Sequence, residues 1–181
     1  MDLEGEVILK KDKIPTKQEL EDAIPNFVGL IEQIPPMYSA LKFEGKSAYE
    51  LARAGHEVDM TKKKRSVTVY DLELIEYGDN KAKFRASVSK GTYIRTLGVD
   101  LARSLDAAAT IVYLERTKAK GFEKKSAITI EKLDEWIKND HNVKDLLLNV
   151  DVVLDDIPVF TISNKDSLAL RNGQIKFVLQ D

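Results

Sequence analysis

"SVTVYDLELIEYGDNKAKFRASVSKGTYIRTLGVDLARSL" spans residues 66–105 and decides the fold, because its hydrophobic period changes along its length. Residues 66–77 are rich in Val, Leu, Ile and Tyr, and residues 81–89 alternate between apolar and polar side chains. Such alternation is typical of a β-strand with one buried face. The letters GDN between the two runs are a turn signal, so we predict an antiparallel hairpin.

A helix is predicted directly after this hairpin. Beyond Gly91 the apolar residues recur three, seven and eleven positions after the first, which is the spacing of one buried helical stripe. These residues are Ile94, Leu97, Leu101 and Leu105. Arg95 lies off the stripe, so its side chain can point at something other than the core.

Shorter elements are predicted on the N-terminal side. Thr16 and Glu19 have the spacing of a capping box, which predicts a helix that Pro25 ends. Residues 1–13 are expected to be a strand or an extended entry. Pro35 and the proline after it force an extended start to the next segment, and residues 47–54 predict a short helix that a glycine stops.

The C-terminal third is predicted to hold a strand, two helices and a turn. Residues 110–116 have strand composition, and Thr129 is a good cap for a helix containing a tryptophan. Residues 143–160 predict a further short helix and a loop. Asn172-Gly173 is a strong hairpin signal, which indicates the start of another β-rich module. The pattern as a whole predicts an α+β fold with a mixed, largely antiparallel sheet and flanking helices.

Composition excludes several classes of protein. The 181 residues are 43% hydrophobic and 32% charged, which suits one domain or one domain plus part of a second. There is no cysteine, and the two histidines are far apart in sequence, so disulfides and a zinc site are not expected. No apolar run is long enough for a membrane span, and the first residues do not have the pattern of a signal peptide. A reducing cytoplasm is the simplest compartment.

Charge is distributed unevenly along the chain. Residues 60–125 hold 15 Lys and Arg against 8 Asp and Glu, a net +7, which leaves −9 for the rest of a chain whose total is −2. A basic middle in an acidic chain can guide a polyanion to one face. The alternative is that runs such as TKKKRS, which ends near Arg65, are merely solvated loops.

Two groups of residues are candidates for a site. At the strand-to-helix junction, Lys90 can meet a phosphate, Tyr93 offers a flat face to a base, and Arg95 can bind a carboxylate or a phosphate. The alternative is a plain cap with a packed tyrosine and a solvated arginine. Phosphate-loop, nucleophile-elbow and HExxH motifs are missing from the sequence.

The second group lies in "PPMYSALKFEGKSAYELARAG", residues 35–55. Basic residues alternate there with aromatics, a composition that suits binding an RNA backbone and stacking on bases. The candidates are Tyr38, Lys42, Lys46 and Arg53, with further aromatics between them. A small subdomain whose tyrosines pack on their own helix would have the same composition.

Three motifs together resemble a known family. They are "EQIPPMYSALKFEGKSAYELARAGHEV", "SKGTYIRTLGVDLARSL" and "YLERTKAKGF", in that order. Their residues and spacing resemble the TruB family, the bacterial tRNA pseudouridine synthases that isomerise the uridine of the TΨC loop. The resemblance covers nearly the whole chain, and the first two motifs are highly specific.

The resemblance implies a domain organisation. Residues 1–160 would be the C-terminal part of a pseudouridine synthase catalytic domain, with a thumb-like insertion at about residues 34–60. "LALRNGQ" resembles the beginning of the family's PUA-like RNA-binding domain, so residues 161–181 would be the start of that domain. "DLEGEV" resembles the family's segment after its catalytic core motif.

The resemblance also implies an activity and its residues. Tyr93 would contact the flipped uridine, Arg95 would pair with the nucleophilic aspartate, and Leu114 would pack against the target base. The reaction needs no metal or cofactor. The partner would be the T-stem-loop of tRNA, with the RNA contacted by a further set of residues. This set is Tyr38, Lys42, Lys46, Arg53, Arg65 and Lys90.

The sequence departs from the family at its nucleophile. The family carries the aspartate in a GxLDPxATG-like motif, and these 181 residues contain none. We therefore expect a fragment without that segment, inactive alone and prone to self-associate through exposed apolar surface, from a monomeric enzyme. Glu115 stands where the family usually has a basic residue. A non-catalytic module that binds RNA stem-loops remains the main alternative, and an interaction scaffold that uses the acidic termini is a third.

Overall fold

A computed structural model describes residues 7–43, 45–56, 58–154 and 157–174. The chain forms two compact units, Met1–Leu114 and Glu115–Asp181, and each is treated by itself below. The predicted boundary after residue 160 stays a prediction.

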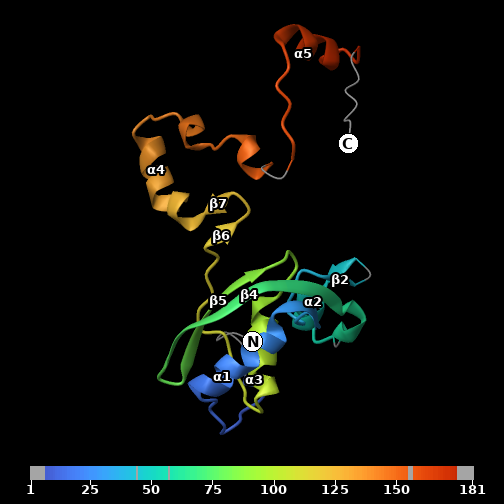
Figure 1. Cartoon of the computed structure of the whole chain (residues 1–181), viewed down its shortest axis with the longest axis vertical. Helices are drawn as coiled ribbons and strands as arrows, with labels where there is room; N and C mark the ends of the chain where they lie inside the picture. The colour runs from blue at the N-terminus through green and yellow to red at the C-terminus, as the bar shows by residue number, and fades with distance from the viewer. Residues whose placement is uncertain (1–6, 44, 57, 155–156, 175–181) are drawn as a thin grey trace. The chain divides into compact units, whose positions relative to one another are not determined.

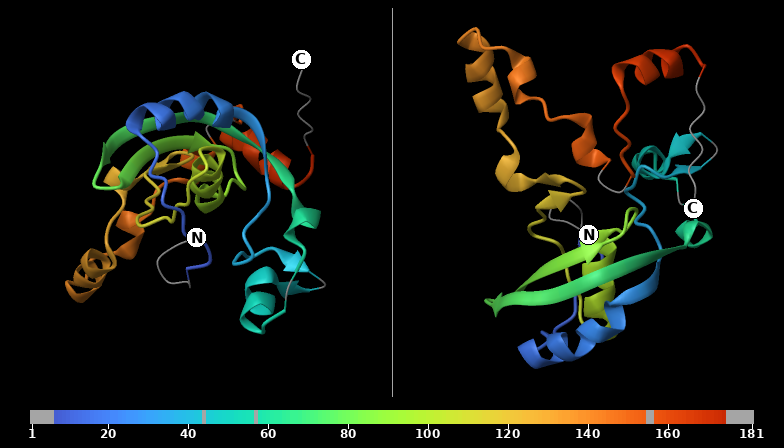
Figure 2. Two further views of the ribbon diagram at one scale, coloured as in Figure 1. Left: turned by 90° about the horizontal axis from the view of Figure 1, so that it is seen from below. Right: turned by 45° about the horizontal axis from the view of Figure 1, so that its top comes forward.

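A three-stranded antiparallel sheet forms the first unit's framework (Figure 1). The strands β1 (Gly29–Gln33), β4 (Arg65–Gly78) and β5 (Lys81–Val88) lie in the order β1-β4-β5. The predicted hairpin is confirmed as β4 and β5, whose turn residues Asp79 and Asn80 both have positive φ. Two register shifts interrupt the β4–β5 ladder, and β4 is one long curved strand in Figure 2. Such irregularities bend a strand.

Two helices bury their apolar stripes against the strands β4 and β5. The helices are α1 (Lys17–Ala23), which continues into the short 3-10 helix η1 (Ile24–Phe27), and α3 (Ile94–Ser104). Leu101 of α3 packs with α1, and Leu97 packs with two buried residues of β4. The predicted helical stripe is therefore confirmed, and the sheet face that carries it forms the core.

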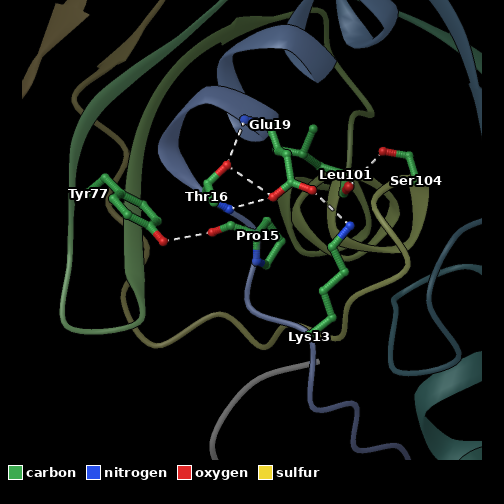
Figure 3. A network of polar contacts seen from close by, with 7 residues as sticks. All are labelled: Lys13, Pro15, Thr16, Glu19, Tyr77, Leu101 and Ser104. Carbon is green, nitrogen blue, oxygen red and sulfur yellow. Dashed lines mark hydrogen bonds and ion pairs between the residues drawn. The ribbon is translucent and has the colours of Figure 1, made fainter.

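The N-terminus of α1 is held by the polar network drawn in Figure 3. The Thr16 hydroxyl accepts from the Glu19 N–H, and the Glu19 carboxylate accepts from the Thr16 N–H, so the predicted capping box is confirmed. Lys13 lies 2.9 Å from the same carboxylate, and the Tyr77 hydroxyl donates to the Pro15 carbonyl oxygen at 2.7 Å. The Lys13 hydrogen bond and then the Thr16 donors lower the pKa of Glu19 from 4.5 to about 2.

Small elements fill the segment between β1 and β4. They are β2 (Lys42–Phe43), β3 (Lys46–Ser47), α2 (Ala48–Arg53) and η2 (Met60–Lys63). Ser47 and Glu50 form a capping box at the start of α2, and Gly55 follows its end at a φ of +76°. The predicted short helix is confirmed. Whether residues 34–60 act as a thumb stays a prediction.

The second unit holds short elements with little burial. They are β6 (Lys118–Ala119), β7 (Phe122–Glu123), η3 (Lys124–Ser126), α4 (Ile130–Lys138), η4 (Val143–Leu146), η5 (Val150–Val153) and α5 (Asn164–Arg171). Thr129 caps α4 as predicted. No described residue of this unit is buried. The short helix predicted within residues 143–160 takes the form of the 3-10 helices η4 and η5.

Two predictions in the C-terminal half were wrong. Residues 110–116 do not form a strand: Ile111 makes a single bridge, and the three apolar side chains after it are exposed. A segment of strand composition forms a strand only when it pairs with a neighbouring strand. In the described structure this segment pairs with no strand. Asn172-Gly173 is not a hairpin turn, because these residues end α5, and Gly173 takes the positive φ that favours glycine after a helix. Residues 1–6 of the predicted extended start, and 175–181 of the predicted β-rich module, lie outside the described residues.

Candidate functional site

The strand-to-helix junction after β5 holds three of the predicted site residues, Lys90, Tyr93 and Arg95. Gly91 turns the chain at a φ of +84°, and Tyr93 is the N-cap residue of α3. Since α3 begins at Ile94, Arg95 lies in its first turn and projects at the same end of the helix as Tyr93. Lys90 is exposed in the turn itself.

Tyr93 and Arg95 line an open pocket of about 440 Å³ in the first unit. Both residues are half-buried, so neither is sealed in the core nor fully solvated. The other walls come from the segment after β1 and from the start of α2. The complete lining is Tyr38, Ser39, Ala40, Ser47, Tyr49, Tyr93 and Arg95.

Aromatic rings and guanidinium groups meet at this pocket. Nη2 of Arg95 donates to the Tyr38 carbonyl oxygen at 3.1 Å, which joins α3 to the segment after β1. The rings of Tyr38 and Tyr49 meet edge to face with their centroids 6.1 Å apart. The guanidinium carbon of Arg53 lies 5.8 Å from the Tyr49 ring centroid. Such a surface can stack on a planar base and attract its phosphate.

Arg65 supports Tyr93 from outside the lining. Its guanidinium carbon lies 5.3 Å from the centroid of the Tyr93 ring. A Cβ added at Gly91 would meet Nη1 of Arg65 at 3.2 Å, so the glycine leaves room for this guanidinium. The predicted RNA-binding residue Arg65 is therefore in contact with the predicted base-binding tyrosine.

Several lysines surround the site without lining it. Lys42 and Lys46 are exposed on the β2–β3 hairpin. The Ser47 backbone N–H is the main cause of the lowered pKa of Glu50, and the two lysines add a smaller attraction. Lys63 lies 4.9 Å from the ring centroid of Phe43.

Leu114 is not brought to the pocket. Its side chain is 57% exposed in the irregular segment that ends the first unit, and it is absent from the pocket lining. Its role against a target base stays a prediction, as do the roles of the other site residues.

Sequence reasoning missed part of the lining and one buried side chain behind it. Ser39, Ala40 and Ser47 lie inside the 32–58 motif, so their proximity to the predicted residues was the available signal, whereas Tyr49 is one of the further aromatics already noted there. Gln33, which is 1% exposed, precedes the proline pair and hydrogen-bonds the backbone of Tyr93. Nothing in the alternation of β1 marks a polar residue as buried.

The described part of the chain supplies neither a metal centre nor a carboxylate in the pocket lining. No group of three or more His, Cys, Asp or Glu side chains is placed there to hold a metal ion. None of the seven lining residues is acidic. Among the described helices none is long and apolar enough to cross a membrane.

The fold and the pocket define an α+β domain of the kind found in pseudouridine synthases. The family model "TruB family pseudouridylate synthase (N terminal domain)" matches residues 1–94, just over half of the chain, and the chain belongs to this family. A chain in the solved "Crystal Structure of a Cbf5-Nop10-Gar1 Complex" is similar over 78% of this chain and 36% of its own, with a TM-score of 0.54 and 25% identity.

Relatives named tRNA pseudouridine synthase B match nearly the whole chain. The relative from Zymomonas mobilis is 41% identical over 96% of this chain and 56% of its own length. Those from Alkaliphilus oremlandii and Caulobacter vibrioides are 38% and 35% identical, again over 56% of their lengths. The chain thus spans about half the length of the curated relatives that it matches.

Proposed function

We propose that this chain is part of a tRNA pseudouridine synthase that acts on the uridine of the TΨC loop. It is the part that holds the target base and binds the RNA backbone. The observation that carries the proposal is the shared pocket of Tyr93, Arg95 and Tyr38, formed by two family motifs that lie far apart in sequence. The relatives' name, tRNA pseudouridine synthase B, supports the same activity.

The pocket suits a nucleotide that has left its stack. A uridine in a folded RNA loop must be flipped out to react, which costs a few kcal/mol. Stacking on an aromatic ring offsets about 1–3 kcal/mol per base. In the proposed complex Tyr93 receives the uracil. Exposed cations on the hairpin and on α2 hold the backbone, and these include Lys42, Lys46 and Arg53.

Arg95 would keep the nucleophilic aspartate ionised. A carboxylate that becomes dry when the base enters would have its pKa raised by desolvation, and a guanidinium in ion-pair distance opposes this by about 1–3 units. Isomerisation then breaks the N1–C1′ bond and forms the C5–C1′ bond, with a proton lost from C5 and one gained at N1. Since the 181 residues hold no GxLDPxATG-like motif, we expect no turnover by this chain alone.

The test is a pseudouridine-formation assay on tRNA with a chimaera. The part of the Zymomonas mobilis relative that precedes the matched region is joined to this chain, and we expect turnover by the chimaera. The variant R95A should lower turnover by about 100-fold or more while tRNA affinity is largely kept. R103A is the matched control, because Arg103 lies on the same helix and contacts only Asp100 among the described hydrogen bonds.

Two outcomes would contradict the proposal. Normal single-turnover chemistry with lost RNA binding in R95A would overturn the assigned role of Arg95. RNA binding by a chimaera without any turnover would favour the alternative, a non-catalytic module that reads stem-loops. An RNA binder should also lose affinity steeply as salt rises, whereas an interaction scaffold should not bind tRNA at all.

The remaining parts of the proposal concern partners and location. The segment of residues 34–60 would close over the T-stem-loop as a thumb, and residues 161–181 would begin the PUA-like domain. A tRNA-modifying enzyme of this bacterial family would work in the cytoplasm. The full-length enzyme would be a monomer, and exposed apolar surface would make the shorter chain prone to self-association.

A further inference from the structure

Gln33 joins the end of β1 to the backbone of Tyr93. The Tyr93 N–H donates to Oε1 of Gln33 at 2.9 Å, and Nε2 of Gln33 donates to the Tyr93 carbonyl oxygen at 3.2 Å. The two residues are 60 positions apart in sequence, and the Gln33 side chain is 1% exposed. The oxygen and the nitrogen of this buried amide both hydrogen-bond the backbone of one residue. The two bonds together restrict the position of that residue's backbone.

Among the described residues, Gln33 is the one whose side chain hydrogen-bonds the Tyr93 backbone. The N-cap residue Tyr93 has no side-chain cap hydrogen bond of its own. The N–H of an N-cap residue has no helical partner, and in a capping box it is satisfied by a Glu or Gln side chain three residues further on. Here the partner for the Tyr93 N–H comes from a strand instead, so the helix start is tied to the sheet.

The same position on the sheet also holds the Tyr93 ring. Gln33 is paired in register with Arg65, the first residue of β4, whose guanidinium lies over the Tyr93 ring. One strand pair therefore contacts Tyr93 at its backbone through Gln33 and at its ring through Arg65. Arg95 lies two residues further on and donates to Tyr38, five residues after Gln33.

We infer that Gln33 is a positioning residue, which fixes the Tyr93 ring and the Arg95 guanidinium for the target base through its two hydrogen bonds to the Tyr93 backbone. The consequence for the base rests on the proposed function, whereas the placement of Tyr93 can be tested without it. Gln33 directly precedes the segment of residues 34–60. The start of that segment and the Tyr93 ring are therefore both positioned through Gln33.

The test compares Q33M with Q18M in the full chain. Methionine keeps the length of glutamine and removes both hydrogen bonds. Gln18 is an exposed glutamine whose amide contacts only Asp22 among the described residues, so Q18M is the matched control. The chain has six tyrosines, and ring-labelled tyrosine NMR, assigned with Y93F, follows Tyr93 directly. We expect the Tyr93 ring signals to move in Q33M and to stay in Q18M.

A second measurement follows the base. A T-stem-loop RNA with 5-iodouridine at the target position is photocrosslinked to the chain, and the yield on Tyr93 is mapped by mass spectrometry. A displacement of about 1 Å in an active site can lower a reaction rate by 10²-fold. We therefore expect the crosslinking yield in Q33M to fall about tenfold or more. RNA affinity should change by less than about twofold, since basic side chains supply most of it.

Q33E keeps the inference falsifiable if Q33M fails to fold. Its carboxylate can accept from the Tyr93 N–H but cannot donate to the carbonyl oxygen, and protonation restores the donor. Burial raises the pKa of such a carboxyl and the guanidinium of its register partner Arg65 lowers it, so the crosslink yield should recover as the pH is lowered through the resulting pKa, followed from about 8 to about 4. A purely structural role would not give this pH dependence.

The outcomes separate this inference from the proposed function. Unchanged Tyr93 signals in a folded Q33M, or wild-type yield from Q33E at every pH, would overturn the positioning role. If the wild-type chain does not bind the RNA at all, the proposed function fails, and the NMR comparison still decides whether Gln33 holds Tyr93.

Discussion

Gly91 is the residue at the site where a side chain is least tolerated, for two reasons. Its φ of +84° lies in the left-handed region, and an added Cβ would come within 3.2 Å of Nη1 of Arg65. Arg65 in turn stacks over Tyr93. A side chain at position 91 would therefore strain the turn, and the guanidinium that supports the ring would have to move by a few tenths of an ångström.

The variant G91A separates these two effects when it is compared with G55A. Gly55 has a φ of +76° with nothing within 4 Å of its added Cβ, so it carries the backbone cost alone. Both variants should lose about 1–2 kcal/mol of unfolding free energy, measured by chemical denaturation. Only G91A should also weaken RNA binding, measured by fluorescence anisotropy. Equal RNA affinity in the two variants would show that moving the Arg65 guanidinium does not affect RNA binding.

Among the elements, α1 has the most explicit electrostatic anchor. Its capping box, Lys13 and the Tyr77–Pro15 hydrogen bond fix the helix start against β4 (Figure 3). The Glu19 carboxylate is the acceptor shared by the Thr16 N–H, the Thr16 hydroxyl and Lys13. Stability of this corner should therefore depend on the ionisation of one side chain.

We expect E19Q to change the pH dependence of unfolding. The pKa of Glu19 is lowered to about 2 in the folded chain from a usual 4.5. Its stabilisation is therefore fully present above about pH 4.5 and is lost as the pH falls towards 2. The difference in unfolding free energy between wild type and E19Q should be constant near neutral pH and should shrink over that acidic range.

E21Q provides the control for this prediction. Glu21 lies on the same helix and forms an exposed ion pair with Lys17 at 3.4 Å, away from the cap. Urea titrations at several pH values measure all three proteins. A wild-type minus E19Q difference that does not shrink on acidification would contradict the role given to the Glu19 carboxylate.

Elements with a local signal could be predicted from the sequence. The β4–β5 hairpin follows from alternation and a turn signal, and α1, α2 and α4 follow from their capping residues. β1 was not predicted, because its five residues are stabilised as a strand only by pairing with β4. For the same reason the strand predicted at residues 110–116 was wrong, since local composition does not say whether a partner is present.

The site divides in a similar way. The family motifs led to Tyr93, Arg95 and Tyr38, and the structure places all three at one pocket. Gln33 could not be found from local patterns, because its two hydrogen bonds span 60 positions of sequence. Contacts at such a distance depend on the register of β1 with β4, which only the folded sheet determines.

At the scale of the whole molecule, burial is concentrated in one part of the chain. All described buried residues lie between Leu20 and Ala107, within the first unit. No described residue of the second unit is buried, and many of its apolar side chains are exposed. Since burial of apolar surface is the main source of stability, the two units should differ in their resistance to denaturation.

We expect two separate unfolding transitions in urea. The single tryptophan, Trp136, lies in the second unit, and all six tyrosines lie in the first. Tryptophan emission should therefore change at a lower urea concentration than the far-ultraviolet circular dichroism of the sheet. It should also change at a lower urea concentration than tyrosine emission, which is measured in a W136F background. Coincident transitions for all probes would mean that the chain unfolds as one cooperative unit.

The hydrogen bonds that assemble the pocket end on main-chain atoms at both tyrosines. Gln33 binds the peptide groups of Tyr93, and Arg95 binds the carbonyl oxygen of Tyr38. Neither scaffold bond depends on which side chain occupies position 38 or 93. The rings at positions 38 and 93 can therefore be exchanged without losing these hydrogen bonds, which makes the pocket a tractable place to re-engineer.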